Sequence, residues 1–260
     1  MKIAVLLKQV LDTEAKIRIA SSGTDVEKEG ETHIANPYDE YAVEEALKIR
    51  EAQGGEVTVL SLGGEKAKEA LRTAVAMGSD NPILISDPLF AGIDPGATAA
   101  VLAKALGKIE YDLILCGKQA IDDDSSYVPI AIAEMLDLPH VSIVTKLDIA
   151  NGSAMAQRQS DAGVEVLTVT LPAVITCQKG LNEPRYPSLP GMMKAKRKEI
   201  PVWGAAELGI DAAFVKENTM TMVESLTLPP ARSAGRLLQG DPAQVAADLV
   251  KALREEKKVV

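Results

Sequence analysis

The stretch VTVLSLGGEKAKEALRTAVAMGSDNPILI, residues 57–85, decides the fold class. It holds two short apolar runs, residues 57–62 and 82–85, which have the length and composition of buried strands. Apolar residues recur at helical spacing between them, at Ala67, Ala70, Leu71, Ala74 and Val75. Gly63 and Gly64 predict a turn before this helix, and Gly78 predicts its end. The stretch therefore predicts a strand–helix–strand unit with parallel strands and a right-handed crossover.

The same alternation continues on both sides of this unit. Apolar runs at residues 3–7 and 113–116 predict two more strands, and residues 39–52 and 96–106 predict helices. A further helix is expected to begin near Ser125 or Ser126. In the 39–52 helix, Glu44 is spaced to pair with Lys48. These elements predict an α/β protein with a doubly wound, mostly parallel, Rossmann-like sheet.

The pattern changes after residue 140. Residues 141–147, 154–159 and 164–170 alternate between apolar and polar and predict antiparallel strands that extend the sheet, and Pro172 opens another apolar run. Three prolines within seven residues indicate a loop or docking segment at 182–200 with no regular element. The last fifty residues contain few large apolar residues. We therefore predict a domain over 1–210 and a C-terminal arm over 211–260.

Composition excludes several classes of function. A net charge of −9 argues against nucleic-acid binding, although Lys194, Lys196, Arg197 and Lys198 form a local basic run. The start of the chain has no signal-peptide pattern, and no apolar run is long enough to insert into a membrane. Two cysteines do not make a disulfide framework. We expect a bacterial cytoplasmic protein with reduced thiols.

A candidate site follows from the sheet, because ligands of doubly wound sheets bind beyond the carboxyl ends of the strands. The segment GKQAIDDDSSYVP, residues 117–129, begins there and leads into a helix, whose N-terminus can bind phosphate. Lys118 offers a positive charge, and one of the three aspartates can accept hydrogen bonds from ribose. The same residues also fit a solvated acidic helix start capped by Ser125 or Ser126. Consecutive aspartates rarely chelate one ion, so no metal site is expected.

Several segments together carry a resemblance to a known family. They are K-x-V-x-D at Lys8, Val10 and Asp12, then AKIRI, Asn36-Pro37, AVEEALK, RTAVAMG, GKQAIDDD and LNEPRYPSLPGMMKAKRKEI. Over nearly its whole length the chain resembles the electron transfer flavoprotein beta subunit family. The resemblance implies an electron carrier rather than an enzyme, working as a heterodimer with a FAD-carrying alpha subunit. Its partners would be acyl-CoA or other flavin dehydrogenases and a downstream quinone oxidoreductase.

The resemblance also implies a nucleotide site that holds AMP as a structural ligand. Carried over by position, its residues are Leu6, Asn36, Pro37, Tyr38, Asp39, Leu62, Gly117, Lys118, Gln119, Ala120, Ile121, Asp122, Asp123, Asp124, Ser125, Ser126, Tyr127 and Val128. The chain departs from the family at Tyr127-Val128-Pro129, where Gln-Thr-Gly is common. Electron-bifurcating relatives carry Gly in place of the middle aspartate and hold a second FAD. Asp123 favours AMP, whereas Val128 leaves open a second FAD with use of NADH.

The family further assigns residues that face partners. Leu189 matches a leucine that anchors partner dehydrogenases, and Met192, Lys194 and Lys196 belong to the same segment. Thr13 and Tyr38 fall near the partner's flavin. No catalytic residue is expected, since a carrier positions its cofactor, and the arm is expected to contact the alpha subunit. A nucleotide-hydrolysing or nucleotide-sensing module of similar architecture remains a third reading.

Overall fold

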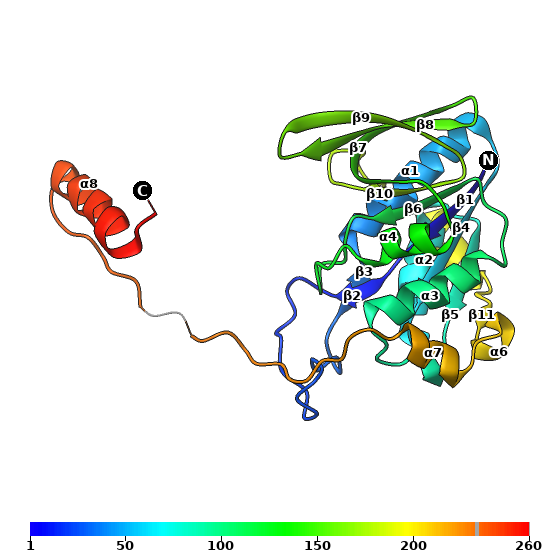
Figure 1. Cartoon of the computed structure of the whole chain (residues 1–260), viewed down its shortest axis with the longest axis horizontal. Helices are drawn as coiled ribbons and strands as arrows, with labels where there is room; N and C mark the ends of the chain where they lie inside the picture. The colour runs from blue at the N-terminus through cyan, green and yellow to red at the C-terminus, as the bar shows by residue number, and fades with distance from the viewer. Residues whose placement is uncertain (232–233, 260) are drawn as a thin grey trace.

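A computed structural model describes residues 1–231 and 234–259. Its centre is a nine-stranded sheet in the order β11-β5-β4-β1-β6-β10-β7-β8-β9 (Figure 1). The parallel strands are β1 (Lys2–Leu6), β4 (Glu56–Leu62), β5 (Asn81–Ile85), β6 (Leu113–Gly117), β7 (His140–Ala150), β10 (Ala173–Cys177) and β11 (Val202–Trp203). β8 (Ser153–Ser160) and β9 (Gly163–Thr170) extend it as antiparallel strands. The predicted α/β class and mostly parallel sheet are confirmed.

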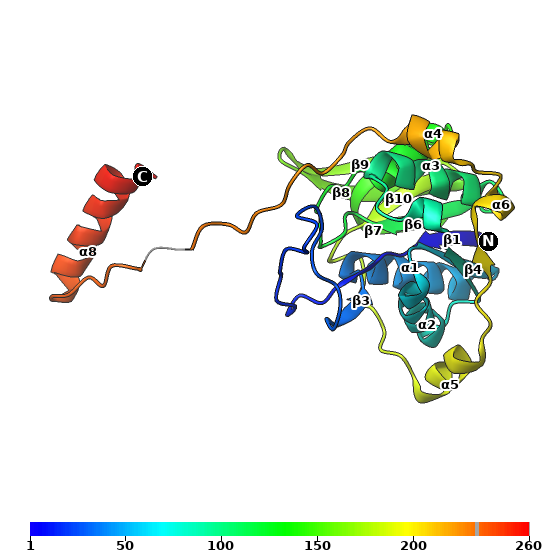
Figure 2. The same cartoon turned by 90° about the horizontal axis from the view of Figure 1, so that it is seen from below.

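Helices cover both faces of the sheet. α1 (Pro37–Gln53) and α2 (Lys68–Met77) lie on one face, and α3 (Pro95–Leu106) and α4 (Val128–Met135) lie on the other (Figure 2). Side chains alternate across a strand, so Ile3 and Val5 of β1 enter the core beneath α1 and α2, while Ala4 enters the core beneath α3. Two separate apolar cores therefore stabilise the sheet from both sides.

Short elements lie close to the ends of the main strands. β2 (Gln9–Leu11) pairs antiparallel with β3 (His33–Ala35) in a two-stranded sheet. Single turns η1 (Glu65–Ala67) and η2 (Pro88–Phe90) precede α2 and α3. β2, β3 and β11 were not predicted from the sequence, because strands of two or three residues carry no usable periodicity.

Three expectations from the sequence were wrong in detail. α4 begins at Val128, and neither Ser125 nor Ser126 caps it. Lys48 pairs with Glu45 at 3.2 Å rather than with Glu44. The 182–200 segment contains a helix, α5 (Leu189–Arg197), where no regular element was expected.

The helix α5 forms despite its prolines because of where they fall. Ser188 caps it by accepting a hydrogen bond from Gly191 N at 3.1 Å. Pro190 occupies the first turn, where a missing N–H breaks no intrahelical bond. The number of prolines alone was therefore not a reliable sign that this segment lacks a helix.

The first part of the C-terminal region packs against the domain, and the rest extends away from it. α6 (Ala205–Leu208) and α7 (Ala212–Asn218) lie beside α3, where Phe214 and Val215 pack against the core. Beyond them the chain is extended and leads to α8 (Pro242–Lys251) and the π-helical turn η3 (Ala252–Lys257), both well away from the domain (Figures 1 and 2). Residues 232, 233 and 260 of the predicted arm lie outside the described residues. Among the described residues, no helix has the length and apolarity needed to span a membrane.

Candidate functional site

A pocket of about 390 Å³ lies at the carboxyl ends of β1, β4 and β6. Its lining includes many of the predicted site residues: Leu6, Asn36, Asp39, Leu62, Gly117, Gln119, Ala120, Asp123, Ser125, Ser126, Tyr127 and Val128. A hollow of about 610 Å³ lies at the opposite edge of the sheet, beside Lys2 and Glu110. Doubly wound sheets bind ligands at their carboxyl edge, so the first pocket is the candidate site.

One wall of the pocket was missed by sequence reasoning. It comes from the loop after β5 and from α3, and includes Phe90, Ile93, Pro95, Thr98 and Leu102. This loop has few charged residues that would mark it as a site. Its position was still predictable, because β5 is parallel to β4 and must end at the same edge.

Asp39, in the first turn of α1, ties together the ends of two strands. Its carboxylate accepts the backbone N–H of Lys8 after β1 at 2.7 Å and that of Gly117 at the end of β6 at 2.9 Å. Burial raises the pKa of Asp39 to about 7, although these hydrogen bonds act to lower it. A side chain at position 117 would collide with Asp39 and Tyr38, so this close approach requires glycine. Asp39 therefore holds the ends of β1 and β6 together at the pocket.

Asn36 performs a similar task for the long loop after β6. Its buried amide donates to Gln119 O at 2.9 Å and accepts from Ile121 N at 3.2 Å. Both polar ends of the side chain are thus occupied by backbone groups of the loop. Asn36 and Asp39 build the site and hold the 117–128 loop in place.

The acidic run of this loop faces Lys8, which was not among the site residues predicted from the sequence. Lys8 Nζ lies 2.8 Å from Asp122 and 3.1 Å from Asp123. Burial acts to lower the pKa of Lys8, but its hydrogen bonds and charge attraction to the two aspartates outweigh this and raise it. Asp123 also accepts Ser125 N at 3.0 Å, while Asp124 accepts from Gln119. The pocket lining contains Lys8 and Lys28 as its cations.

Lys118 was expected to supply positive charge, but it lies outside the pocket lining. Its ammonium sits 5.0 Å from the ring centre of Tyr38, a cation–π geometry. The other predicted residues outside the lining are Pro37, Tyr38, Ile121, Asp122 and Asp124. Thr13 is an exposed residue that donates to Asp12 at 3.3 Å.

The start of α4 presents backbone donors at the pocket. Ser126 has a left-handed backbone with φ of 55°, and α4 begins two residues later. In the described part of the chain, the backbone N–H groups of Ser126 and Tyr127 donate to no protein acceptor. Free N–H groups at a helix N-terminus attract anions, and Pro129 in the first turn adds none. This rim suits a phosphate group.

The predicted docking residues lie away from the pocket, on the face of the sheet covered by α1 and α2 (Figure 2). Leu189, Met192, Lys194 and Lys196 are all exposed on α5. Within the described residues, no cluster of three or more histidine, cysteine or acidic side chains is arranged to hold a metal ion.

Comparison with known proteins agrees with this architecture. The family model described as "Electron transfer flavoprotein domain" matches residues 24–208. The electron transfer flavoprotein subunit beta of Bacillus subtilis is 44% identical over 262 residues, covering 100% of both chains. Subunit CarD of the caffeyl-CoA reductase-Etf complex of Acetobacterium woodii is 40% identical, covering 98% of this chain and 99% of CarD. Since the family model and these full-length relatives agree, the chain belongs to the family of electron transfer flavoprotein beta subunits.

Proposed function

We propose that this chain binds one AMP in the 390 Å³ pocket and, with a FAD-carrying alpha subunit, relays electrons from flavin dehydrogenases to a downstream quinone oxidoreductase. The observation that carries AMP binding is the rim formed by the free N–H groups of Ser126 and Tyr127, with Lys8 nearby. A phosphate fits this rim, and the apolar wall containing Phe90 and Leu102 suits an adenine ring. The pocket volume lies in the ordinary range for small ligands, roughly 300–1,000 Å³.

AMP has a structural role in this proposal. Asn36 and Asp39 fix one side of the 117–128 loop, and a bound nucleotide fixes the side that faces the pocket. A ligand that binds only the folded state stabilises that state. No side chain is required to transfer a proton or attack a substrate, because electron transfer depends on where the flavin is placed.

The alternative is a second FAD in the same pocket, which would make the complex an electron-bifurcating oxidoreductase that uses NADH. Val128 points toward this alternative, since the chain departs from the family's common Gln-Thr-Gly at Tyr127-Val128-Pro129. A relative that is 40% identical, CarD, is a subunit of a caffeyl-CoA reductase-Etf complex. Asp123 favours AMP, because electron-bifurcating relatives carry Gly in place of this middle aspartate.

The deciding experiment is to purify the chain with its alpha subunit, denature the complex, and quantify the released AMP and FAD by chromatography. One AMP and one FAD per heterodimer would support the proposal. Two FAD and no AMP would replace it with the bifurcating alternative. A complex with one FAD and no nucleotide would contradict both.

We also propose that residues 182–200, here named the docking segment, bind the partner dehydrogenase. Leu189 is 75% exposed at the start of α5, and Met193 is 59% exposed on the same helix. Lys194 and Lys196 border these apolar side chains with positive charge. The surface fits a protein that offers an apolar pocket beside acidic residues.

A further inference from the structure

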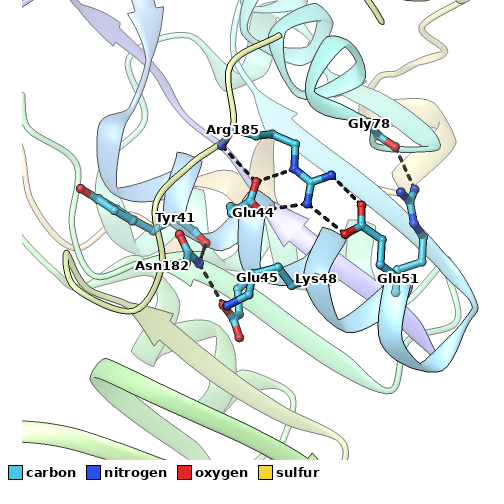
Figure 3. Close-up of polar contacts among 9 residues, drawn as sticks. Tyr41, Glu44, Glu45, Lys48, Glu51, Gly78, Asn182 and Arg185 are labelled. Atoms are coloured by element: carbon cyan, nitrogen blue, oxygen red, sulfur yellow. Dashed lines mark hydrogen bonds and ion pairs between the residues drawn. The ribbon is translucent and has the colours of Figure 1, made fainter. Parts of the chain in front are cut away.

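An arginine of the docking segment is held by two glutamates of α1 (Figure 3). Arg185 Nε and Nη2 donate to the two oxygens of Glu44 at 2.8 and 2.9 Å, and Arg185 N donates to Glu44 at 3.1 Å. Its Nη1 and Nη2 also reach the two oxygens of Glu51. One side chain and its own backbone are thereby fixed to a helix 141 residues earlier in the chain.

Burial makes this contact necessary for Glu44. Its exposed fraction is only 5%, and a buried carboxylate is costly unless a cation and hydrogen bonds compensate it. The neighbouring cation Lys48 is bound to Glu45 instead. Arg185 supplies the compensation with the planar, two-pronged geometry that a lysine ammonium does not have.

Additional contacts hold both sides of Arg185. Asn182 donates its amide to Glu45 at 2.9 Å and to Tyr41 O at 3.0 Å, before Arg185 in the chain (Figure 3). On the far side, Arg72 of α2 donates to Ala195 O. Gly191 lies so close to Ala76 O that a side chain at position 191 would collide with it. The docking segment is thus attached to α1 at its start and to α2 along its helix.

The apolar side chains of the segment project from between these contacts. Tyr186 follows Arg185 directly and is 94% exposed, and Leu189 and Met193 are also exposed. A binding surface that is already ordered loses less conformational entropy when a partner docks. The backbone is therefore fixed on both sides of the exposed residues Tyr186, Leu189 and Met193.

We propose that Arg185 is a positioning residue for the docking segment, holding Tyr186, Leu189 and Met193 in the geometry that an electron-donating dehydrogenase binds. The inference rests on the docking role in the proposed function. It adds that Arg185 sets the population of the docking-competent geometry through Glu44 and Glu51, without touching the partner or the cofactor.

The test uses the complete FAD-loaded heterodimer and a flavin-dependent acyl-CoA dehydrogenase as the electron donor. Arg185→Gln is expected to raise the KM for the heterodimer about tenfold, because the apparent affinity falls with the docking-competent fraction. The kcat and the rate of direct reduction by dithionite should stay within about twofold of wild type. Arg185→Lys should not rescue the KM, since lysine cannot bind both glutamates in the same plane.

Hydrogen exchange gives a second measurement on the same proteins. Amides of residues 186–197 should exchange at least about fivefold faster in Arg185→Gln, while those of β1, β4 and β6 stay unchanged, because the opening is local. Glu134→Gln, at an exposed glutamate of α4, is the matched control and should change neither the KM nor this exchange. If Arg185→Gln does not fold, Glu51→Gln removes only the more exposed partner and should still raise the KM about twofold to threefold.

The outcomes separate this inference from the docking proposal through Leu189→Ala. If Leu189→Ala raises the KM and Arg185→Gln does not, Arg185 is not a positioning residue. If neither variant changes the KM, the proposal that the docking segment binds the dehydrogenase is wrong. Loss of FAD or a large fall in Tm for Arg185→Gln, with an unchanged KM for Glu51→Gln, would show a general structural role and overturn the inference.

Discussion

The docking segment and the C-terminal arm both expose large apolar side chains, but the domain holds them to different extents. The docking segment is fixed by Asn182 and Arg185 on α1 and by Arg72 on α2. The arm is fixed near its root, where Asp94 accepts Met220 N at 2.9 Å and Thr221 N at 2.8 Å. Farther along, Leu226 N donates to Gly23 O at 2.8 Å, and α8 then lies apart from the domain (Figure 1).

This difference indicates two kinds of partner. An ordered surface binds and releases with little reorganisation, which suits a dehydrogenase that must leave after each electron transfer. An extended arm loses much entropy when it is ordered, and that loss is offset only by a large interface. We therefore expect the docking segment to serve transient partners and the arm to grip the permanent alpha subunit.

Deleting the arm after Thr221 should have the largest effect. The Kd for the alpha subunit is expected to rise at least about a hundredfold, which corresponds to a loss of roughly 3 kcal/mol of binding free energy. The Tm of the isolated chain should change little, because both apolar cores lie before this point. Calorimetric titration and thermal unfolding measure the two quantities. An unchanged Kd would remove the distinction between arm and docking segment.

Leu189→Ala should have the next largest effect, on a different partner. Removing an anchor side chain typically costs about 2 kcal/mol, so kcat/KM with the dehydrogenase should fall roughly thirtyfold. The Kd for the alpha subunit and the FAD content should be unchanged. Met155→Ala, at an exposed apolar residue of β8, is a matched control. A fall in heterodimer affinity would show that the docking segment also belongs to the permanent interface.

Asp94→Asn should release the root of the arm while keeping the start of α3. The amide oxygen can still accept Ala97 N, but the amide nitrogen cannot accept from Met220 and Thr221. We expect the Kd for the alpha subunit to rise about threefold to tenfold, and the amides of Met220 and Thr221 to exchange faster. Unchanged exchange at these two amides would show that Asp94 does not anchor the arm.

The same carboxylate predicts a pH dependence of the anchor. Burial acts to raise the pKa of Asp94, but hydrogen bonds from Ala97, Met220 and Thr221 outweigh it and lower the pKa below 3.8. The stabilisation is therefore present above pH 3.8 and is lost as the pH falls through the lower folded value. Exchange of Met220 and Thr221, referenced to the exchange of β6 amides, should lose its protection over this acidic range in wild type. Asp94→Asn should show no such transition.

The smallest effect is expected for Lys194→Gln combined with Lys196→Gln. Both lysines are exposed at the border of the apolar surface, where charges mainly raise the association rate. The rate constant for association with the dehydrogenase should fall a few-fold at low salt and match wild type near 0.5 M salt, since salt screens exposed charges. A difference that persists at high salt would place these lysines in direct, desolvated contact.

Much of the fold followed from sequence periodicity, because β1, β4, β5 and β6 are buried apolar runs and α1 to α3 have clear helical spacing. Which charged residues pair with one another could not be predicted from the sequence. The sequence spacing predicted a pair between Glu44 and Lys48, which lies four residues later. In the structure Glu44 is buried beneath the docking segment and pairs with Arg185, while Lys48 pairs with Glu45. The pocket was located by the strand-end rule, whereas its Phe90 wall and the role of Lys8 required the three-dimensional arrangement.

Helix α1 also sets the distance between the candidate pocket and the glutamates that hold Arg185. It is 17 residues long, begins after Asn36 at the candidate pocket, and carries Glu51 near its far end. At a rise of 1.5 Å per residue, the two positions are separated by about 22 Å along the helix axis. Under the proposed function, a dehydrogenase bound to the docking segment would therefore lie at a fixed distance from a nucleotide in the candidate pocket. An insertion of one residue in α1 before Glu44 would rotate Glu44 and Glu51 by about 100° relative to the pocket, so the length of α1 constrains the position of Arg185 and of the docking segment.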